Sequence, residues 1–440
     1  MTETSPATPA DPRGESAHAF ATTTLSAMAS RPRGGPPWLE ARRAEAASRF
    51  DATGFPGSND EAFRFTELSR VLRVPYTPLS GRRVPSPLDG LAVRRVRIDN
   101  GRVDADGLGE GAGLEVRRVS EVLAHEPGLL EPYLARLAAS DNGLVAQNTA
   151  LFEDGVLVVA RARGKAGPLH LAFSGAAGSP AFATPRVVIV VERGSQLEVV
   201  ESHASDGDYL ESSVTEVFVG EGAHVDHVRV ELGSERAAAL ATVAVRQERD
   251  SRYRSQVVSF GGKLARVDLR VELAEPGAEC SLDGLFLADG RTLLDHHTRV
   301  VHASPRCTSR QRYKGIADGH GVGVFDGTVV VQSGASGTEA HQENRNLLLS
   351  NDAVVHAKPH LEIDTDDVRC SHGATVGRLD PEQLFYLRSR GIDASVARSL
   401  LTYAFAREVV SAVNRADLRK VLEELVATRL PSGRAAKELA

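Results

Sequence analysis

The chain has 440 residues, of which 42% are hydrophobic and 25% charged, the composition of a globular protein with a sizeable core. Its formal charge of -6 argues against a nucleic-acid binder, whose phosphate contacts require a basic face. No run of about 18 apolar residues is present, and the N-terminus lacks an apolar core after a basic start, so neither a membrane span nor a secretory signal is expected. Three widely separated cysteines make no disulfide framework, so a cytoplasmic protein without membrane partners is predicted.

The first third of the chain is predicted to contain a tail and a helical region. Residues 1–36 are rich in Ser, Thr, Pro, Ala and Gly and bury too little apolar surface to offset the entropy of ordering, so a disordered tail is predicted. Residues 37–142 are predicted to form an N-terminal helical region with a few short strands. Its first helix is expected to begin at Pro37 and to end at Gly54.

Residues 143–377 have a different pattern. Short valine-rich runs bounded by Gly, Asp, Asn or Ser follow one another without a helical period, which is typical of β-structure. Gly194 and Gly222 open similar runs 28 residues apart, and Gly277 follows after 55 more, about two such steps. A repeat of this length suits a β-solenoid, because each coil buries its face on the next. A mainly β fold with a central parallel β-helix is therefore predicted, and a β-sandwich is the alternative, although this stretch is long for one.

The chain becomes helical again after Gly377. Asp380 is expected to cap a helix that begins at Pro381 and ends near Gly391. Further along, apolar residues recur at helical spacing from Leu418. Residues 378–430 are therefore predicted to form a C-terminal helical domain, followed by a tail at 431–440.

The stretch "DVRCSHGATVG" contains the most suggestive pair of side chains. A strand places residues i and i+2 on one face, so Cys370 and His372 could point at one spot. A thiolate and an imidazole suit zinc, iron or an iron–sulfur cluster, but a cluster normally takes four protein ligands. On spacing alone, such a pair is more often structural than functional.

Other chemistry-bearing residues have ordinary interpretations. Cys280 and Cys307 are expected to face the solenoid interior as small apolar residues. The acidic run "EIDTDD" at 362–367 lacks the pattern of an EF-hand and is expected to be a solvated strand edge and turn. The histidines scattered through the β-region are expected to be surface or satisfied core residues. Phosphate-loop and G-x-S-x-G motifs are absent from the sequence, so nothing self-contained indicates an enzyme.

Residues 344–410 resemble the SufB/SufD family of iron–sulfur cluster assembly scaffolds. The resemblance rests on N-x-N-L-L-L-S, K-P-x-L-E-I, D-D-V-x-C-S-H-G-A-T-x-G and L-F-Y-L-x-S-R-G-I in succession, and it extends more loosely over about 37–425. Gly373 stands where the SufB branch typically has glutamate, which places the chain with the SufD branch. The resemblance implies a right-handed parallel β-helix between N-terminal and C-terminal helical domains, in agreement with the residue patterns.

The resemblance also implies a non-catalytic role in an ATPase-coupled assembly complex. A SufD-type chain pairs with a SufB-like subunit through the β-helix and docks a SufC-like ATPase through its C-terminal helices, and ATP binds only to that partner. His372 is then the leading ligand of a transient iron–sulfur cluster or iron shared with the partner, and Cys370 is its neighbour. Candidate ATPase-docking residues in the C-terminal helices are Leu384, Phe385, Tyr386, Arg390, Leu400, Tyr403 and Phe405.

Two other functions stay open at this point. Alternating carboxylates and many histidines would suit a metal-assisted β-solenoid hydrolase acting on a polymer, although aromatic residues that could stack on sugars are few. A homodimeric adaptor without a metal role is the third hypothesis. The sequence leaves undecided whether the resting state is a homodimer or a heterodimer, and whether a flavin visits the complex.

Overall fold

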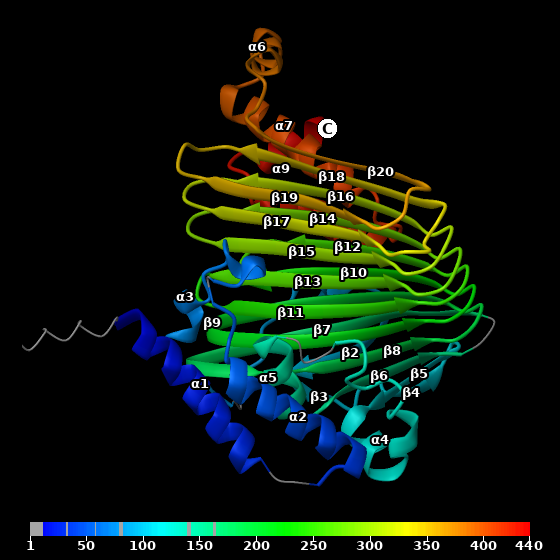
Figure 1. Cartoon of the computed structure of the whole chain (residues 1–440). Coiled ribbons are helices and arrows are strands. Elements are labelled where there is room, and N and C mark those ends of the chain that lie inside the picture. Colours follow the sequence, from blue (N-terminus) through cyan, green and yellow to red (C-terminus); the bar gives the residue numbers. More distant parts are fainter. Residues whose placement is uncertain (1–11, 32–33, 58, 79–81, 139–141, 162–163) are drawn as a thin grey trace, which may run out of the picture.

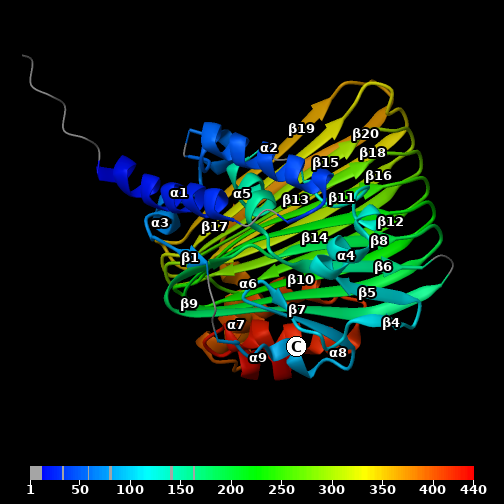
Figure 2. The same ribbon diagram turned by 90° about the horizontal axis from the view of Figure 1, so that it is seen from below.

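The computed structural model describes residues 12–31, 34–57, 59–78, 82–138, 142–161 and 164–440 (Figure 1). In these residues, 20 strands form one continuous sheet that winds into a parallel solenoid of about eight turns. The N-terminal helices lie against one outer face of the solenoid and the C-terminal helices against the opposite face (Figure 2). The predicted mainly β fold, a parallel β-helix flanked by helices at both ends of the chain, is confirmed.

The regular elements have the following bounds. The helices are α1 (Pro12–Ser30), α2 (Pro37–Thr53), η1 (Glu61–Phe63), α3 (Ser69–Leu72), η2 (Pro87–Gly90), α4 (Val119–His125), η3 (Pro127–Leu129), α5 (Gly143–Leu151), α6 (Pro381–Ser389), α7 (Ala394–Val410), α8 (Ala416–Thr428) and α9 (Gly433–Leu439). The strands are β1 (Thr77–Pro78), β2 (Arg94–Asp99), β3 (Arg102–Val103), β4 (Gly109–Gly111), β5 (Leu114–Arg118), β6 (Gly155–Ala160), β7 (Lys165–Ala183), β8 (Arg186–Val191), β9 (Gln196–Val219), β10 (His224–Gly233), β11 (Ala238–Gln247), β12 (Arg252–Ser259), β13 (Leu264–Leu273), β14 (Glu279–Ala288), β15 (Leu293–His302), β16 (Thr308–Ala317), β17 (Val322–Val331), β18 (Thr338–Leu348), β19 (Val354–Ile363) and β20 (Val368–Gly377).

Each strand of the solenoid pairs in parallel with the strand two places further along the chain. One ladder runs β10–β12–β14–β16–β18–β20, and the other runs β11–β13–β15–β17–β19. The long strand β9 pairs with both β10 and β11 and so begins both ladders. Side chains therefore lie in columns, with one residue from each coil. Residues that are paired in the register face the same side of the solenoid wall.

One corner of each coil requires a left-handed backbone. Gly222 and Gly277 have φ of 64° and 78° there, and their amides donate to carbonyls of the next coil. Asp250 and Arg306 take the same position in the intervening coils, with φ of 54° and 58°. Glycine adopts this conformation at little cost, whereas other residues are strained. The sequence repeat looked irregular because these two coils lack the marker glycine.

The solenoid interior is closely packed with apolar side chains. Cys280 and Cys307 lie in this core, 4% and 0% exposed, as the sequence predicted. Burial raises the pKa of both thiols, which keeps them protonated and unreactive.

The N-terminal tail is a correction to the sequence prediction. Residues Pro12–Ser30 form helix α1 instead of a disordered segment, and residues 1–11 lie outside the described part of the chain. Phe20 on α1 is fully buried, and its ring lies 5.2 Å from Phe55 and 5.3 Å from Tyr76, centroid to centroid. Burial of this aromatic side chain offsets the ordering entropy that composition alone suggested could not be met.

Two further segments differ from the sequence prediction. Residues Gly143–Leu151, expected to begin the β-helix, form helix α5, which Asn142 caps by accepting a hydrogen bond from the Val145 amide. The expected C-terminal tail contains helix α9, whose Ala436 is fully buried.

The predicted helix starts at Pro37 and at Asp380–Pro381 are confirmed. Within the described residues, no helix is both long and apolar enough to span a bilayer.

Candidate functional site at the last coil

Cys370 and His372 lie on β20, the last strand of the solenoid. In the parallel register Cys370 pairs with Ala340 and His372 with Gln342 on β18. Both of these partners are buried, at 1% and 4% exposure, so their column faces the solenoid interior. Residues two apart on a strand share a face, and the sequence prediction that Cys370 and His372 point the same way is confirmed.

The interior is open at this coil. Within the described residues, β20 pairs with β18 and β19 pairs with β17, and no further coil follows. His372 is consequently exposed, while Cys370 is half-buried and packs against the apolar cluster that contains Ala340. Burial raises the pKa of the Cys370 thiol, so the thiolate forms less readily than in water. The pair therefore stands at the mouth of the solenoid.

The interior just below this mouth is lined by amides. Asn346 donates through Nδ2 to Asn344 Oδ1 at 2.6 Å and to the Thr375 carbonyl at 3.1 Å. Gln342 Nε2 lies 3.4 Å from Gln311 Oε1 one coil deeper. Sequence reasoning did not assign these side chains a place in the site, although the N-x-N pattern at 344–346 was the available signal. They present a neutral polar floor beneath His372.

The pair has few potential co-ligands in its own chain. In the described ranges, no three His, Cys, Asp or Glu side chains converge closely enough to hold a metal ion. The carboxylates of the acidic run point to solvent at Asp364, Asp366 and Asp367. Most buried histidines are engaged elsewhere, as His296 is by Ser259 at 2.8 Å and His302 is by Ser309 at 2.8 Å.

Large apolar side chains surround the mouth. Ile363 is the last residue of β19 and Val376 the penultimate residue of β20, and they are 40% and 46% exposed, although their register partners on the preceding coil are buried. We call Ile363 and Val376 the apolar rim. Val354, at the start of β19, is 41% exposed but lies on the outer face, since its register partner Val322 packs on the side of the N-terminal helices. Together with the unpaired backbone edges of two strands, this rim has the properties of a protein interface.

The candidate docking residues fall into two groups. Leu384, Phe385 and Tyr386 lie on α6, which projects beyond the last coil (Figure 1). Phe385 and Tyr386 are 73% and 58% exposed, and the Arg390 guanidinium lies 5.3 Å from the Tyr386 ring centroid. This group forms an exposed aromatic surface.

The second group lies on α7, against the solenoid wall. Tyr403 is 2% exposed within the core between the C-terminal helices and the solenoid, so it is not part of an accessible surface. Phe405 is partly buried, with the Lys314 ammonium 4.2 Å above its ring. Leu400 is partly exposed. The structure thus separates the residues of α7 from the aromatic surface of α6.

Comparisons with known proteins agree with this architecture. The chain matches the family model "SUF system FeS cluster assembly, SufBD core domain" over residues 173–405. It is 30% identical over 392 residues to the iron–sulfur cluster assembly protein SufD of Escherichia coli (strain K12), with 87% of this chain and 90% of that protein covered.

Two further relatives have similar coverage. The chain is 33% identical over 409 residues to the chloroplastic protein ABCI7 of Arabidopsis thaliana, covering 87% of this chain and 84% of that protein. It is 29% identical over 423 residues to the iron–sulfur cluster assembly SufBD family protein slr0076 of Synechocystis, covering 88% and 90%. From the family match and the long alignments it follows that this chain belongs to the SufBD family of the SUF iron–sulfur cluster assembly system.

Proposed function

We propose that this chain is a non-catalytic, SufD-type scaffold subunit that assembles iron–sulfur clusters in the cytoplasm together with a SufB-like subunit and a SufC-like ATPase. His372 is a ligand of the nascent cluster or of its iron, and Cys370 is a second ligand. The cluster is cargo that the complex builds and releases. ATP acts only through the partner ATPase.

The observation that carries this proposal is the position of Cys370 and His372 at an open mouth. Two ligands from one chain leave about two of the usual four to be supplied by another molecule. The apolar rim and the unpaired edges of β19 and β20 offer that molecule a surface on which to dock. A SufB-like β-helix seated there would bring its own ligands to the same spot. An exposed imidazole and a half-buried thiol with a raised pKa are ligands from which a cluster can be released.

The aromatic surface of α6 is the proposed dock for the ATPase. Only residues 378–380 separate β20 from α6, so movement of α6 is transmitted directly to the strand that bears the ligands. Exposed Phe385 and Tyr386, with Arg390, have the composition typical of interface anchors. The buried Tyr403 is left out of this surface.

The test is reconstitution of the whole complex. The chain is co-expressed with SufB-like and SufC-like partners, purified without oxygen, and assayed for complex recovery and for iron and sulfide bound per complex. The His372→Ala variant should assemble normally because the side chain is exposed. Cluster yield should fall by about tenfold or more, since even the loss of a side chain that only supports a metal ligand usually costs that much.

The matched control is His320→Ala, because His320 is exposed in a turn between β16 and β17, away from the mouth. This control should keep full cluster yield. Full yield with His372→Ala would remove His372 from the site. Failure of the chain to bind either partner would contradict the scaffold function, and a stable complex of two identical chains at the same edge would instead support the homodimeric adaptor.

A further inference from the structure

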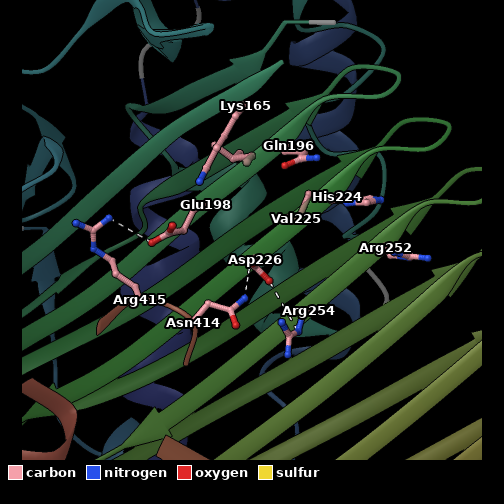
Figure 3. A pocket seen from close by; sticks show the side chains of 11 residues that line it. Lys165, Gln196, Glu198, His224, Val225, Asp226, Arg252, Arg254, Asn414 and Arg415 are labelled. Atoms are coloured by element: carbon pink, nitrogen blue, oxygen red, sulfur yellow. Dashed lines mark hydrogen bonds and ion pairs between the residues drawn. The ribbon is translucent and has the colours of Figure 1, made fainter. Parts of the chain in front are cut away.

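A groove outside the solenoid lies where the loop between α7 and α8 crosses the first residues of β9, β10 and β12 (Figure 3). Its volume is about 450 Å³, a size typical of small-molecule sites. The floor of the groove is formed by β7, β9, β10 and β12, several coils before the last one, and none of its lining residues belongs to the mouth.

The register of the strands builds the floor of the groove from two rows of side chains. Lys165 pairs with Gln196, Gln196 with His224, and His224 with Arg252, which gives one row across four coils. Two residues further along each strand, Glu198, Asp226 and Arg254 form the second row on the same face. Because the rows lie on paired strands, the charged groups are held on a rigid surface.

The two carboxylates in the groove are already matched. The C-terminal loop places Arg415 Nη1 3.4 Å from Glu198 Oε1, and Asn414 Nδ2 donates to Asp226 Oδ2 at 3.0 Å (Figure 3). Arg254 Nε lies 3.9 Å from Asp226 Oδ1. The negative charge of Glu198 and Asp226 is thus offset by groups from the solenoid and from the loop between α7 and α8.

Lys165, His224 and Arg252 remain accessible to a ligand in the groove. Within the described part of the chain, neither the Lys165 ammonium nor the His224 ring has a side-chain partner. Arg252 has one ion pair, to Glu279 at 3.3 Å, and both side chains are more than half exposed, so this pair is weak and exchangeable. The lining holds four Lys or Arg side chains and two carboxylates, and two carboxylates beside it also pair with these cations, Asp417 with Arg415 at 2.6 Å and Glu279 with Arg252 at 3.3 Å. Because the Asp417 and Glu279 side chains are 41% and 52% exposed, both pairs are open to solvent, and an anion in the groove can compete with these carboxylates for the cations.

We propose that this groove binds a phosphate-bearing small molecule. Lys165 supplies a point charge, and Arg252 and Arg254 supply planar donors that match phosphate oxygens. Because Asn414 and Arg415 form its other wall, the bound molecule contacts both the solenoid and the loop that joins α7 to α8 (Figure 3). This inference does not depend on the cluster-assembly role proposed above.

The test is calorimetric titration of the full chain with inorganic pyrophosphate at low ionic strength. Saturable binding is expected, and it should weaken as salt is added because the contacts are charged and solvent-accessible. Lys165→Gln should weaken binding by about fivefold, the loss expected for one partly solvated charge, and Lys165→Gln with Arg252→Gln by more. Both side chains are exposed, so the variants should fold.

The matched control is Arg291→Gln, which removes the same charge from an exposed turn between β14 and β15, at a different corner of the coil. It should leave pyrophosphate affinity unchanged. Absence of saturable binding to the unmodified chain would overturn the proposal. Equal weakening by Arg291→Gln and Lys165→Gln would overturn it as well, because it would show attraction to overall charge instead of a site.

Discussion

His203 lies inside the solenoid within a cluster of buried charges. Its Nδ1 is 2.5 Å from Glu211 Oε1, and its Nε2 is 3.4 Å from Glu201 Oε2. Arg229 bridges Glu201 and Glu231 at 2.6 and 2.7 Å. Buried charges are tolerated only when paired and hydrogen-bonded, and this cluster meets that condition.

The protonation of His203 links this cluster to pH. Burial and the nearby Arg229 act to lower the pKa of His203, but the carboxylates of Glu211, Glu231 and Glu201 outweigh them and raise it to about 9. The charged imidazole therefore stabilises the folded state. Since the folded pKa lies above the ordinary value of 6.5, this contribution is fully present below pH 6.5 and is lost as pH rises through about 9.

We predict that the free energy of unfolding falls by about 3 kcal/mol between pH 6.5 and pH 10 through this residue, and that His203→Gln reduces the fall. Urea unfolding across this pH range measures the effect. The control is His302→Gln, because burial lowers the pKa of His302 to about 4 and its ring is already neutral throughout the range. The control variant should keep the slope of the unmodified chain, and an unchanged slope in His203→Gln would contradict the prediction.

Helix α1 is held against the solenoid largely through the side chain of Phe20. The sequence of residues 1–36 has no strong apolar stripe, and among the described side chains of α1 the largest buried one is Phe20, supported by Ala27 and Met28 and by a hydrogen bond from Gln147 to the buried Thr24. The aromatic partners of Phe20 come from distant segments, with the Phe182 ring 5.5 Å away on β7 and Tyr76 just before β1. The helix therefore depends on tertiary packing more than on its own propensity.

We predict that Phe20→Ala detaches α1 from the solenoid. Removal of a fully buried phenylalanine costs about 3–5 kcal/mol at its site, more than we expect the smaller described contacts of Thr24, Ala27 and Met28 to supply. Hydrogen exchange should show loss of protection in α1 while the solenoid strands keep theirs. Leu129→Ala is the control, since Leu129 is 47% exposed and its truncation should change stability by less than about 0.5 kcal/mol. Unaltered protection of α1 in Phe20→Ala would show that other contacts hold the helix.

The whole molecule is asymmetric along the solenoid axis. The first coils are covered by the N-terminal strands and helices, whereas β19 and β20 end the stack with an open interior and the apolar rim (Figure 1). Stacked repeats usually need a cap because the face of a terminal coil is as apolar as the interior. Among the described residues, the uncapped end coincides with Cys370 and His372, which links the candidate site to the association proposed above.

We predict that Val376→Glu weakens association of the chain with its partner by at least about tenfold without unfolding it. Val376 is 46% exposed and so tolerates a charge in the free chain, but a docked β-helix would bury that charge. Sedimentation of the chain with a SufB-like partner, and of the chain alone, measures the association. Leu439→Glu on α9, at a side chain 60% exposed, should leave association intact. Equal association of Val376→Glu would place the interface elsewhere.

The sequence by itself determined the long β-region with its solenoid-like repeat, the cap at Asp380, the helix start at Pro37, and the position of Cys370 and His372 on one strand face. These features depend on local chemistry: valine-rich runs, capping residues and the two-residue period of a strand. Only the tertiary structure decided that α1 is ordered, that Tyr403 is buried, and that the cysteine–histidine pair stands at an open mouth above Gln342 and Asn344. Each of these depends on contacts between residues far apart in the chain, which local pattern does not encode.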